Sequence, residues 1–252
     1  MFTRFGSLKP TIAQYWLNTI FLVPHVLSNN KRVPLQQCIR QWYEEEEHKI
    51  MVVKSPSSIG KTSTLVYLKK HIESTFRTDC MLIDLKNRPT LEELRAMQKQ
   101  LKNCMTLLVN NYEKSEHIQE LLKLFSINLY PNKRLVLTSD TSNYVEETVS
   151  GVFILAGLEE LVEECELVPF DDKQITEFIG KHIELHGVPK GVEKEAIEKQ
   201  VMRLDESRRV ISSPSLLNFV MHFLAELIRQ QQPLSKFGLL KTVINKCNED
   251  HK

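Results

Sequence analysis

Short apolar segments alternate with amphipathic segments along much of the chain. The apolar segments are rich in Val, Ile and Leu, and the segments between them carry apolar residues at the three- and four-residue spacing of a helix. The apolar segments cover residues 49–54, 80–85, 105–109 and 134–138, with a weaker fifth at 165–168. A buried helix turn is the alternative for each segment taken singly. Five in alternation predict an α/β fold, in which helices cover both faces of a parallel sheet.

The two ends of the chain carry helical patterns without this alternation. Residues 1–48 are predicted to form a helical lead-in that is interrupted by a turn at Ser28–Asn30. After the fifth apolar segment, Asp171 is a good N-cap for a helix that Gly187 would end, and Ser213–Pro214 has the cap and first-turn proline of another. The expected organisation is a lead-in over 1–48, an α/β domain over 49–170 and a small all-helical subdomain over 171–252.

The clearest chemical motif follows the first apolar segment. Ser55–Thr62 has the spacing of a phosphate-binding loop, G-x-x-x-x-G-K-[ST], with serine at the first glycine position. In such a loop, backbone N–H groups and the start of the next helix bind phosphate, and Lys61 and Thr62 would hold phosphate oxygens and Mg²⁺. An ordinary strand–turn–helix connection is the alternative, because a Gly-Lys-Thr triplet alone is a weak signal. The residues expected to contact nucleotide are Ser55, Ser57, Ser58, Ile59, Gly60, Lys61, Thr62 and Ser63.

Two later apolar segments end in polar residues that belong beside this loop. Asn110 stands where a Walker B segment has its magnesium-binding aspartate, and its amide can bind a magnesium-bound water without bringing charge. Glu113 can orient water or act as a base, although an exposed loop glutamate is the alternative. At the end of the next segment, Ser139 can donate a hydrogen bond to a γ-phosphate, whereas Asp140 would repel it.

Together these motifs resemble a STAND-class P-loop NTPase of the NACHT kind, over roughly residues 22–227. The stretches that carry the resemblance besides the loop are Val23–Leu27, Asn110–Lys114 at the Walker B position, Leu137–Asp140 at the sensor, Val168–Ile175 at the junction into the helices, and Ser213–Leu217 at the Pro-Leu-Leu element. The resemblance implies a sheet with strand order 5-1-4-3-2, an ATP/ADP switch that uses Mg²⁺, and a contact between Pro214 and the adenine.

Four positions depart from the family pattern. Ser55 replaces the first loop glycine, Asn110 the magnesium aspartate, Lys114 the last acid and Asp140 the sensor arginine. A left-handed Ser55 would cost about 1–2 kcal/mol, whereas losing a base or a metal-orienting group costs about 10²–10⁴ in rate.

We therefore expect a degenerate or truncated member that binds ATP or ADP in a signalling role and is at most a weak ATPase. The alternative is a pseudo-NTPase interaction scaffold that binds no nucleotide. A small-molecule kinase is less favoured, because only Arg134 lies between Asn110 and Asp140 to serve as a lid arginine.

The amino-acid composition limits the kinds of partner that the chain is expected to bind. Lys and Arg number 33 against 32 Asp and Glu, for a net charge of +1, so no global field attracts nucleic acid or an anionic membrane. The five cysteines are scattered, and no apolar run is long enough to span a bilayer. We expect a cytoplasmic protein whose partners are nucleotide and other proteins or further copies of itself. Glycine is scarce, at 8 of 252 residues, and Ser55 and Asn111 stand where the resemblance expects it.

Overall fold

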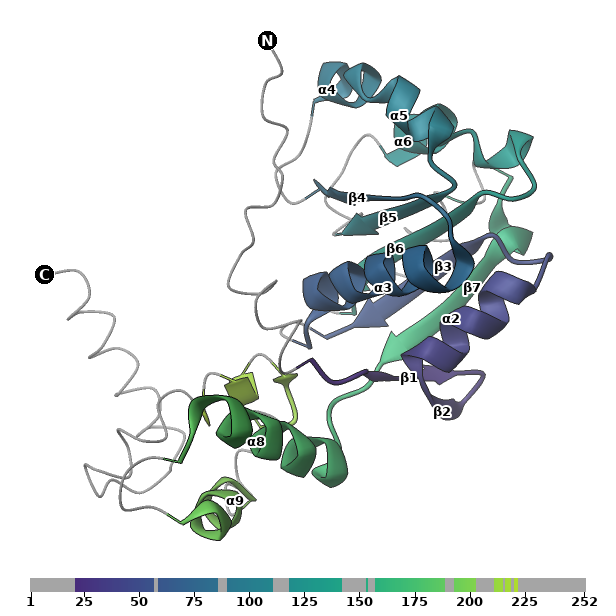
Figure 1. Ribbon diagram of the computed structural model, residues 1–252. Coiled ribbons are helices and arrows are strands. Elements are labelled where there is room, and N and C mark those ends of the chain that lie inside the picture. Colours follow the sequence, from purple (N-terminus) through teal and green to yellow (C-terminus); the bar gives the residue numbers. More distant parts are fainter. Residues whose placement is uncertain are drawn as a thin grey trace, which may run out of the picture. The chain divides into compact units, whose positions relative to one another are not determined.

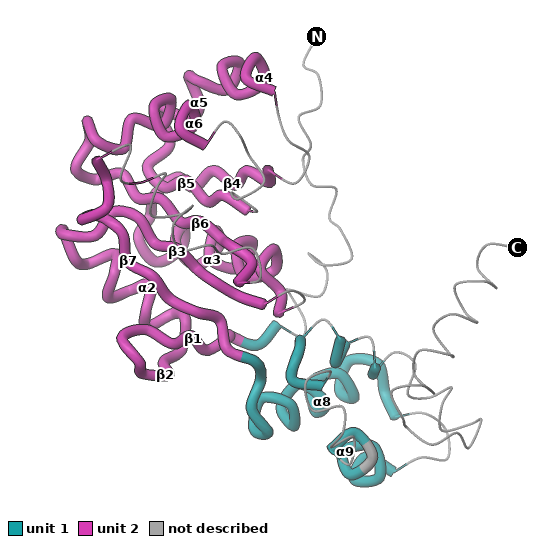
Figure 2. The backbone as a smooth tube through the Cα atoms, turned by 180° about the vertical axis from the view of Figure 1, so that it is seen from behind, with its two compact units in different colours: residues 1–22, 169–252 teal, residues 23–168 magenta. Residues whose placement is uncertain are grey.

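A computed structural model gives the fold, and its contacts divide the chain into two compact units, residues 23–168 and residues 1–22 with 169–252 (Figure 2). The structure describes residues 21–56, 59–85, 90–110, 118–141, 153, 157–188, 193–202, 211–214, 216–218 and 220–221. The sequence-based boundaries after residues 48 and 170 differ from this division chiefly at the first, since residues 23–48 belong to the same unit as the sheet.

The described strands of the larger unit form one sheet of seven strands in the order β2-β1-β7-β3-β6-β5-β4 (Figure 1). The strands are β1 His25–Ser28, β2 Lys31–Pro34, β3 Ile50–Ser55, β4 Cys80–Asp84, β5 Thr106–Asn110, β6 Arg134–Asp140 and β7 Val162–Leu167. The five strands from β7 to β4 are parallel, and they correspond to the five apolar segments. Their order is the expected 5-1-4-3-2, which confirms the predicted fold class.

Helices cover both faces of this sheet. The helices of the unit are α2 Leu35–Glu44, α3 Lys61–Phe76, α4 Leu91–Ala96, α5 Gln98–Asn103 and α6 Ile118–Phe125, with 3₁₀ turns at Ile127–Leu129 and Glu159–Leu161. Residues of α2 and α3 share one buried cluster with Met51 and Val53, whereas residues of α4, α5 and α6 share another with Ile50 and Val52. Successive residues of β3 therefore enter opposite cores, which is why a strand buried on both faces shows no polar alternation.

The first described strands correct the prediction of a helical lead-in. Residues 25–34 form a hairpin in which Val26 pairs with Val33, and β1 also pairs antiparallel with β7. The two turn residues, Asn29 and Asn30, have φ angles of 49° and 59°. Asparagine tolerates this left-handed conformation well, and two such residues in succession favour a two-residue hairpin loop. The helical expectation was wrong here, because four-residue strands are too short to show a clear period.

The smaller unit is built around two described helices, α8 Asp172–His186 and α9 Lys194–Met202. The Asp171 side chain accepts from the Gln174 N–H in a capping box, and Gly187 ends α8 with a φ of 77°. Both of these helix boundaries were expected from the sequence. None of the described helices combines the length and the apolar character needed to span a bilayer.

Candidate nucleotide-binding site

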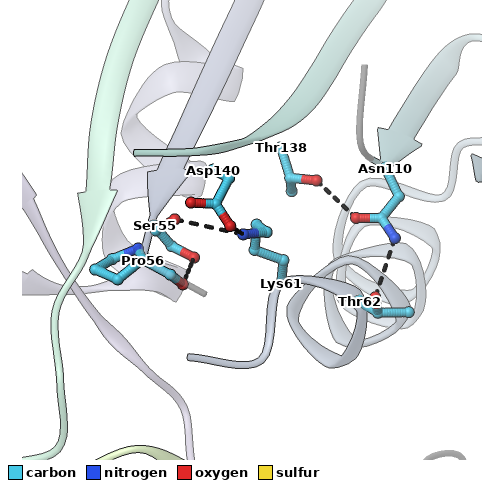
Figure 3. Close-up of polar contacts among 7 residues, drawn as sticks. All are labelled: Ser55, Pro56, Lys61, Thr62, Asn110, Thr138 and Asp140. Carbon is cyan, nitrogen blue, oxygen red and sulfur yellow. Dashed lines mark hydrogen bonds and ion pairs between the residues drawn. The ribbon is translucent and has the colours of Figure 1, made fainter. Parts of the chain in front are cut away.

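The candidate site lies where parallel strands end and α3 begins. In the β3–β6 ladder, Ser55 is paired with Asp140, so the two residues at the strand ends are adjacent. Parallel strands present their carboxyl ends at one edge of a sheet, where α/β proteins commonly bind ligands. Figure 3 shows the polar side chains that this edge and the start of α3 bring together. We call these residues the strand-tip group: Ser55, Lys61, Thr62, Asn110, Thr138 and Asp140.

Gly60 provides the turn from the loop into α3. Its backbone is left-handed, with φ 94° and ψ 33°, and its carbonyl accepts from the Thr64 N–H at 2.9 Å. A Cβ added at Gly60 would meet nothing within 4 Å, so glycine is required by conformation and not by space. The neighbouring Ile59 is buried in the core with α3, which anchors this end of the loop.

Ser55 does not carry the strain that its replacement of glycine suggested. It ends β3 in extended conformation and is not among the described residues with a positive φ. Its hydroxyl donates to the carbonyl of Pro56 at 3.0 Å. The first glycine position of the motif is therefore occupied here by an ordinary strand residue, at no cost in backbone strain.

Lys61 is engaged by an acidic residue of the chain. Its Nζ lies 2.9 Å from Oδ2 of Asp140, and it also donates to the carbonyl of Ser55 at 3.4 Å. The two charged side chains are only 12% and 11% exposed, so this pair is largely shielded from water. The sequence suggested Asp140 only as a group that repels phosphate. The structure shows that it compensates the charge of the loop lysine.

A second contact chain joins the remaining members of the strand-tip group. Thr138 Oγ1 donates to Asn110 Oδ1 at 2.8 Å, and Asn110 Nδ2 donates to Thr62 Oγ1 at 3.0 Å. Asn110 is 1% exposed and uses both ends of its amide in these bonds. The structure thus brings together Asn110 and Thr62, which the sequence analysis assigned to one site, and adds Thr138, whose contribution the sequence did not indicate.

This arrangement fits a phosphate group better than it fits Mg²⁺. The left-handed Gly60 and the first turn of α3 offer backbone N–H groups and the positive end of the helix dipole. Mg²⁺ is usually held by one or two carboxylates together with substrate phosphates. Here Thr62 Oγ1 accepts from an amide N–H, and Asp140 is paired with Lys61.

Other residues of interest lie apart from the strand-tip group. Side chains alternate along β6, so Ser139 lies on the opposite face from Thr138 and Asp140. Its hydroxyl is buried and has no hydrogen-bond partner among the described residues. Ser63 is half-buried in the first turn of α3. Arg134 begins β6 at the far end of the strand and donates to the backbone carbonyl of Glu45, so it is no lid arginine.

Several expected site residues fall elsewhere. Ser57, Ser58, Asn111, Glu113 and Lys114 lie outside the described residues. The Ser213–Pro214 element belongs to the smaller unit, where Pro214 is a half-buried helical residue. The roles assigned to Glu113 as a base and to Pro214 at the adenine stay predictions.

No family model matches the sequence, and no curated protein is detectably similar to it. Solved structures share its fold. Domain III of the Thermotoga maritima replication initiation protein DnaA has 14% identity and a TM-score of 0.53, over 84% of this chain and 90% of that one. The Aeropyrum pernix ORC2 protein, solved as ADPNP–ADP complexes, has 10% identity and a TM-score of 0.55, over 84% and 65%. A Walker-type ATPase of Pyrococcus abyssi has 14% identity and a TM-score of 0.52, over 86% and 74%.

At these identities the likeness is one of fold. The chain has the α/β fold of P-loop NTPases, which confirms that part of the family resemblance. The NACHT class, the signalling role and the hydrolytic capacity stay predictions.

Proposed function

We propose that this chain is a nucleotide-binding P-loop module that takes ATP or ADP and hydrolyses ATP weakly or not at all. The observation that carries the proposal is the β3–loop–α3 connection, in which left-handed Gly60 directs Lys61 and the start of α3 to the edge formed by β3 and β6. This is the local geometry that phosphate recognition requires, since backbone N–H groups and a lysine then converge on one place.

Weak hydrolysis is supported by the charges of the strand-tip group. Asn110 is neutral and held between two hydroxyl groups, so it provides no carboxylate to fix Mg²⁺. Lys61 already forms an ion pair with Asp140, which offsets part of its positive charge. In a catalytic loop that charge must instead stabilise the negative charge that develops on the transferred phosphate. Removing one such electrostatic stabiliser typically costs about 10²–10³ in rate.

The further assignment to a NACHT-type STAND module is also a proposal. It rests on the sequence resemblance, on the agreement of strand order with that family and on the helical unit that follows the sheet. Such a module would act as an ATP/ADP switch that controls contacts with protein partners or with other copies of itself.

One contact also favours the alternative, a pseudo-NTPase scaffold that binds no nucleotide. Because Asp140 already supplies an anion to Lys61, the chain itself satisfies the group that nucleotide would satisfy. In a scaffold of this kind the ion pair would stabilise the fold, and the loop would bind no phosphate.

A titration distinguishes the two proposals. ATP and ADP are added to the wild-type chain with Mg²⁺ and with EDTA, and binding is followed by calorimetry and by the shift in melting temperature. Lys61→Met should abolish ATP binding. Its matched control is Lys54→Met, which removes a neighbouring lysine whose ion pair with Glu164 lies on the other face of β3.

The double variant Lys61→Met/Asp140→Asn separates binding from stability, because it removes the lysine without leaving its acidic partner charged. Saturable wild-type binding that Lys61→Met removes and Lys54→Met preserves supports the nucleotide module. If the wild type binds neither nucleotide, the scaffold is supported instead. Equal ATP binding by the wild type and Lys61→Met contradicts both proposals, because nucleotide would then bind without the loop lysine.

A further inference from the structure

Asp140 occupies an unusual place for an acidic residue, because it is held against the lysine of a phosphate-binding loop. We propose that Asp140 makes this site selective for a nucleoside diphosphate over the corresponding triphosphate. The proposal rests on the proposed function, since selectivity has meaning only if the site binds nucleotide. It assigns to Asp140 a role in specificity that neither the motif nor the fold implies.

The position of Asp140 is fixed by the backbone. It ends β6, a central strand whose ladder with β3 pairs Asp140 with Ser55. The next residue, Thr141, donates its N–H to the carbonyl of Ser55 at 3.0 Å and extends this pairing beyond the strand end. A carboxylate held in this way does not move aside easily when an anion approaches Lys61.

Within the strand-tip group the charges balance without any ligand. Within the strand-tip group only Lys61 and Asp140 are charged, and they are in contact at 2.9 Å (Figure 3). The other members are hydroxyl and amide groups, which donate and accept hydrogen bonds but do not offset an added charge. An incoming polyphosphate therefore meets no net positive charge from these side chains.

A diphosphate and a triphosphate place different demands on this group. Backbone N–H groups at the start of α3 can bind a terminal β-phosphate without any change in the ion pair. A third phosphate needs the loop lysine, which normally spans the β- and γ-phosphates. To provide it, Lys61 would have to leave Asp140, and a shielded carboxylate would then stand beside the added phosphate.

Magnesium does not remove this penalty here. A bound cation ordinarily offsets the extra charge of a triphosphate, and an acidic residue at the Walker B position helps to hold that cation. In this chain the position is Asn110, whose amide bridges Thr138 and Thr62. The discrimination against triphosphate should therefore persist when Mg²⁺ is present.

The test compares ADP and ATP affinities in three chains, by calorimetry in EDTA and again in Mg²⁺. We expect the wild type to bind ADP about tenfold more tightly than ATP, and Asp140→Asn to bring the two affinities close together, mainly by strengthening ATP binding. The matched control is Glu164→Gln, which makes the same charge change in the Lys54 ion pair and should leave the wild-type ratio unchanged.

Each outcome is decisive. A wild-type preference for ADP that Asp140→Asn removes and Glu164→Gln retains supports the inference. Binding that depends on Lys61 but shows equal affinities, or a ratio that Asp140→Asn leaves unchanged, overturns the inference and leaves the proposed function standing. If neither ADP nor ATP binds, both the inference and the proposed function are overturned. If Asp140→Asn does not fold, Asp140→Thr replaces it, because a β-branched residue suits the end of a strand.

Discussion

Lys133 is a buried lysine that joins the ends of two helices. Its replacement tests how much its ammonium group contributes to the stability of the larger unit. The side chain is 2% exposed. Its Nζ donates to the backbone carbonyls of Leu101 and Lys102, both at 3.0 Å, and of Phe125 at 2.6 Å. These carbonyls belong to the last turns of α5 and α6, where helical partners are missing and the helix dipole is negative.

The expected effect of Lys133→Met follows from these contacts. Hydrogen bonds from a charged donor contribute about 1.5–3 kcal/mol each, so the three bonds are worth roughly 4.5–9 kcal/mol. Against this stands the cost of burying the ammonium, which is several kcal/mol in proteins. Burial lowers the pKa of Lys133, which is the expected direction because burying the charged ammonium costs free energy. We expect the variant to lose about 3 kcal/mol in the free energy of unfolding, because methionine donates to none of these carbonyls. The carbonyls of Lys102 and Phe125 lose the Lys133 donor, and that of Leu101 keeps only the thiol of Cys104 at 3.5 Å.

Thermal and urea denaturation followed by far-UV circular dichroism measure this loss. For a chain of this size, about 3 kcal/mol corresponds to a melting temperature lower by roughly 6–12 °C. The control is Lys123→Met on the exposed face of α6, which should stay within about 0.5 kcal/mol of the wild type. If Lys133→Met is as stable as this control, the ammonium does not cap the two helices in the way described.

Three further predictions concern the site and the cysteines. Gly60→Ala forces a non-glycine residue to φ 94° and should weaken nucleotide binding about tenfold, whereas Gly180→Ala inside α8 should leave binding unchanged in the same titration. Asn110→Asp places a carboxylate between the same two hydroxyl groups and should make ATP affinity depend on Mg²⁺; equal affinities in Mg²⁺ and in EDTA would contradict this. Burial raises the pKa of Cys80 to about 12 and that of Cys104 to about 11. Both thiols should therefore resist iodoacetamide at pH 8 in the native protein and react in urea, as peptide mass mapping would show; rapid native labelling would refute the burial argument.

The apolar pattern was sufficient to find the five parallel strands. β3, β5 and β6 are buried on both faces, so each appears in the sequence as a short apolar run that a solvated antiparallel strand would not produce. β7 is partly exposed, and its apolar segment was the weakest of the five. The strand order came from the family resemblance and not from the pattern itself. The hairpin at residues 25–34 was missed, although Asn29–Asn30 carried a turn signal. Its strands are only four residues long, and β1 is held in the sheet by pairing with β7, more than a hundred residues later in the chain.

The sequence by itself determined the features that depend on residues near one another in the chain. The loop that ends in Gly60 and Lys61 and the capping box at Asp171 are of this kind, because their geometry follows from backbone conformation over a few residues. These local features located the candidate site and the start of the helical unit.

Only the tertiary structure decided what the charges at the site do. Lys61 and Asp140 are 79 residues apart in sequence, and the β3–β6 register makes them an ion pair. In the same way, the fold turns Asn110 into a bridge between two hydroxyl groups and Lys133 into a cap for two helices. The strength and even the sign of a charge's contribution depend on its distance to other charges and on its exposure to water, and the packed sheet sets both.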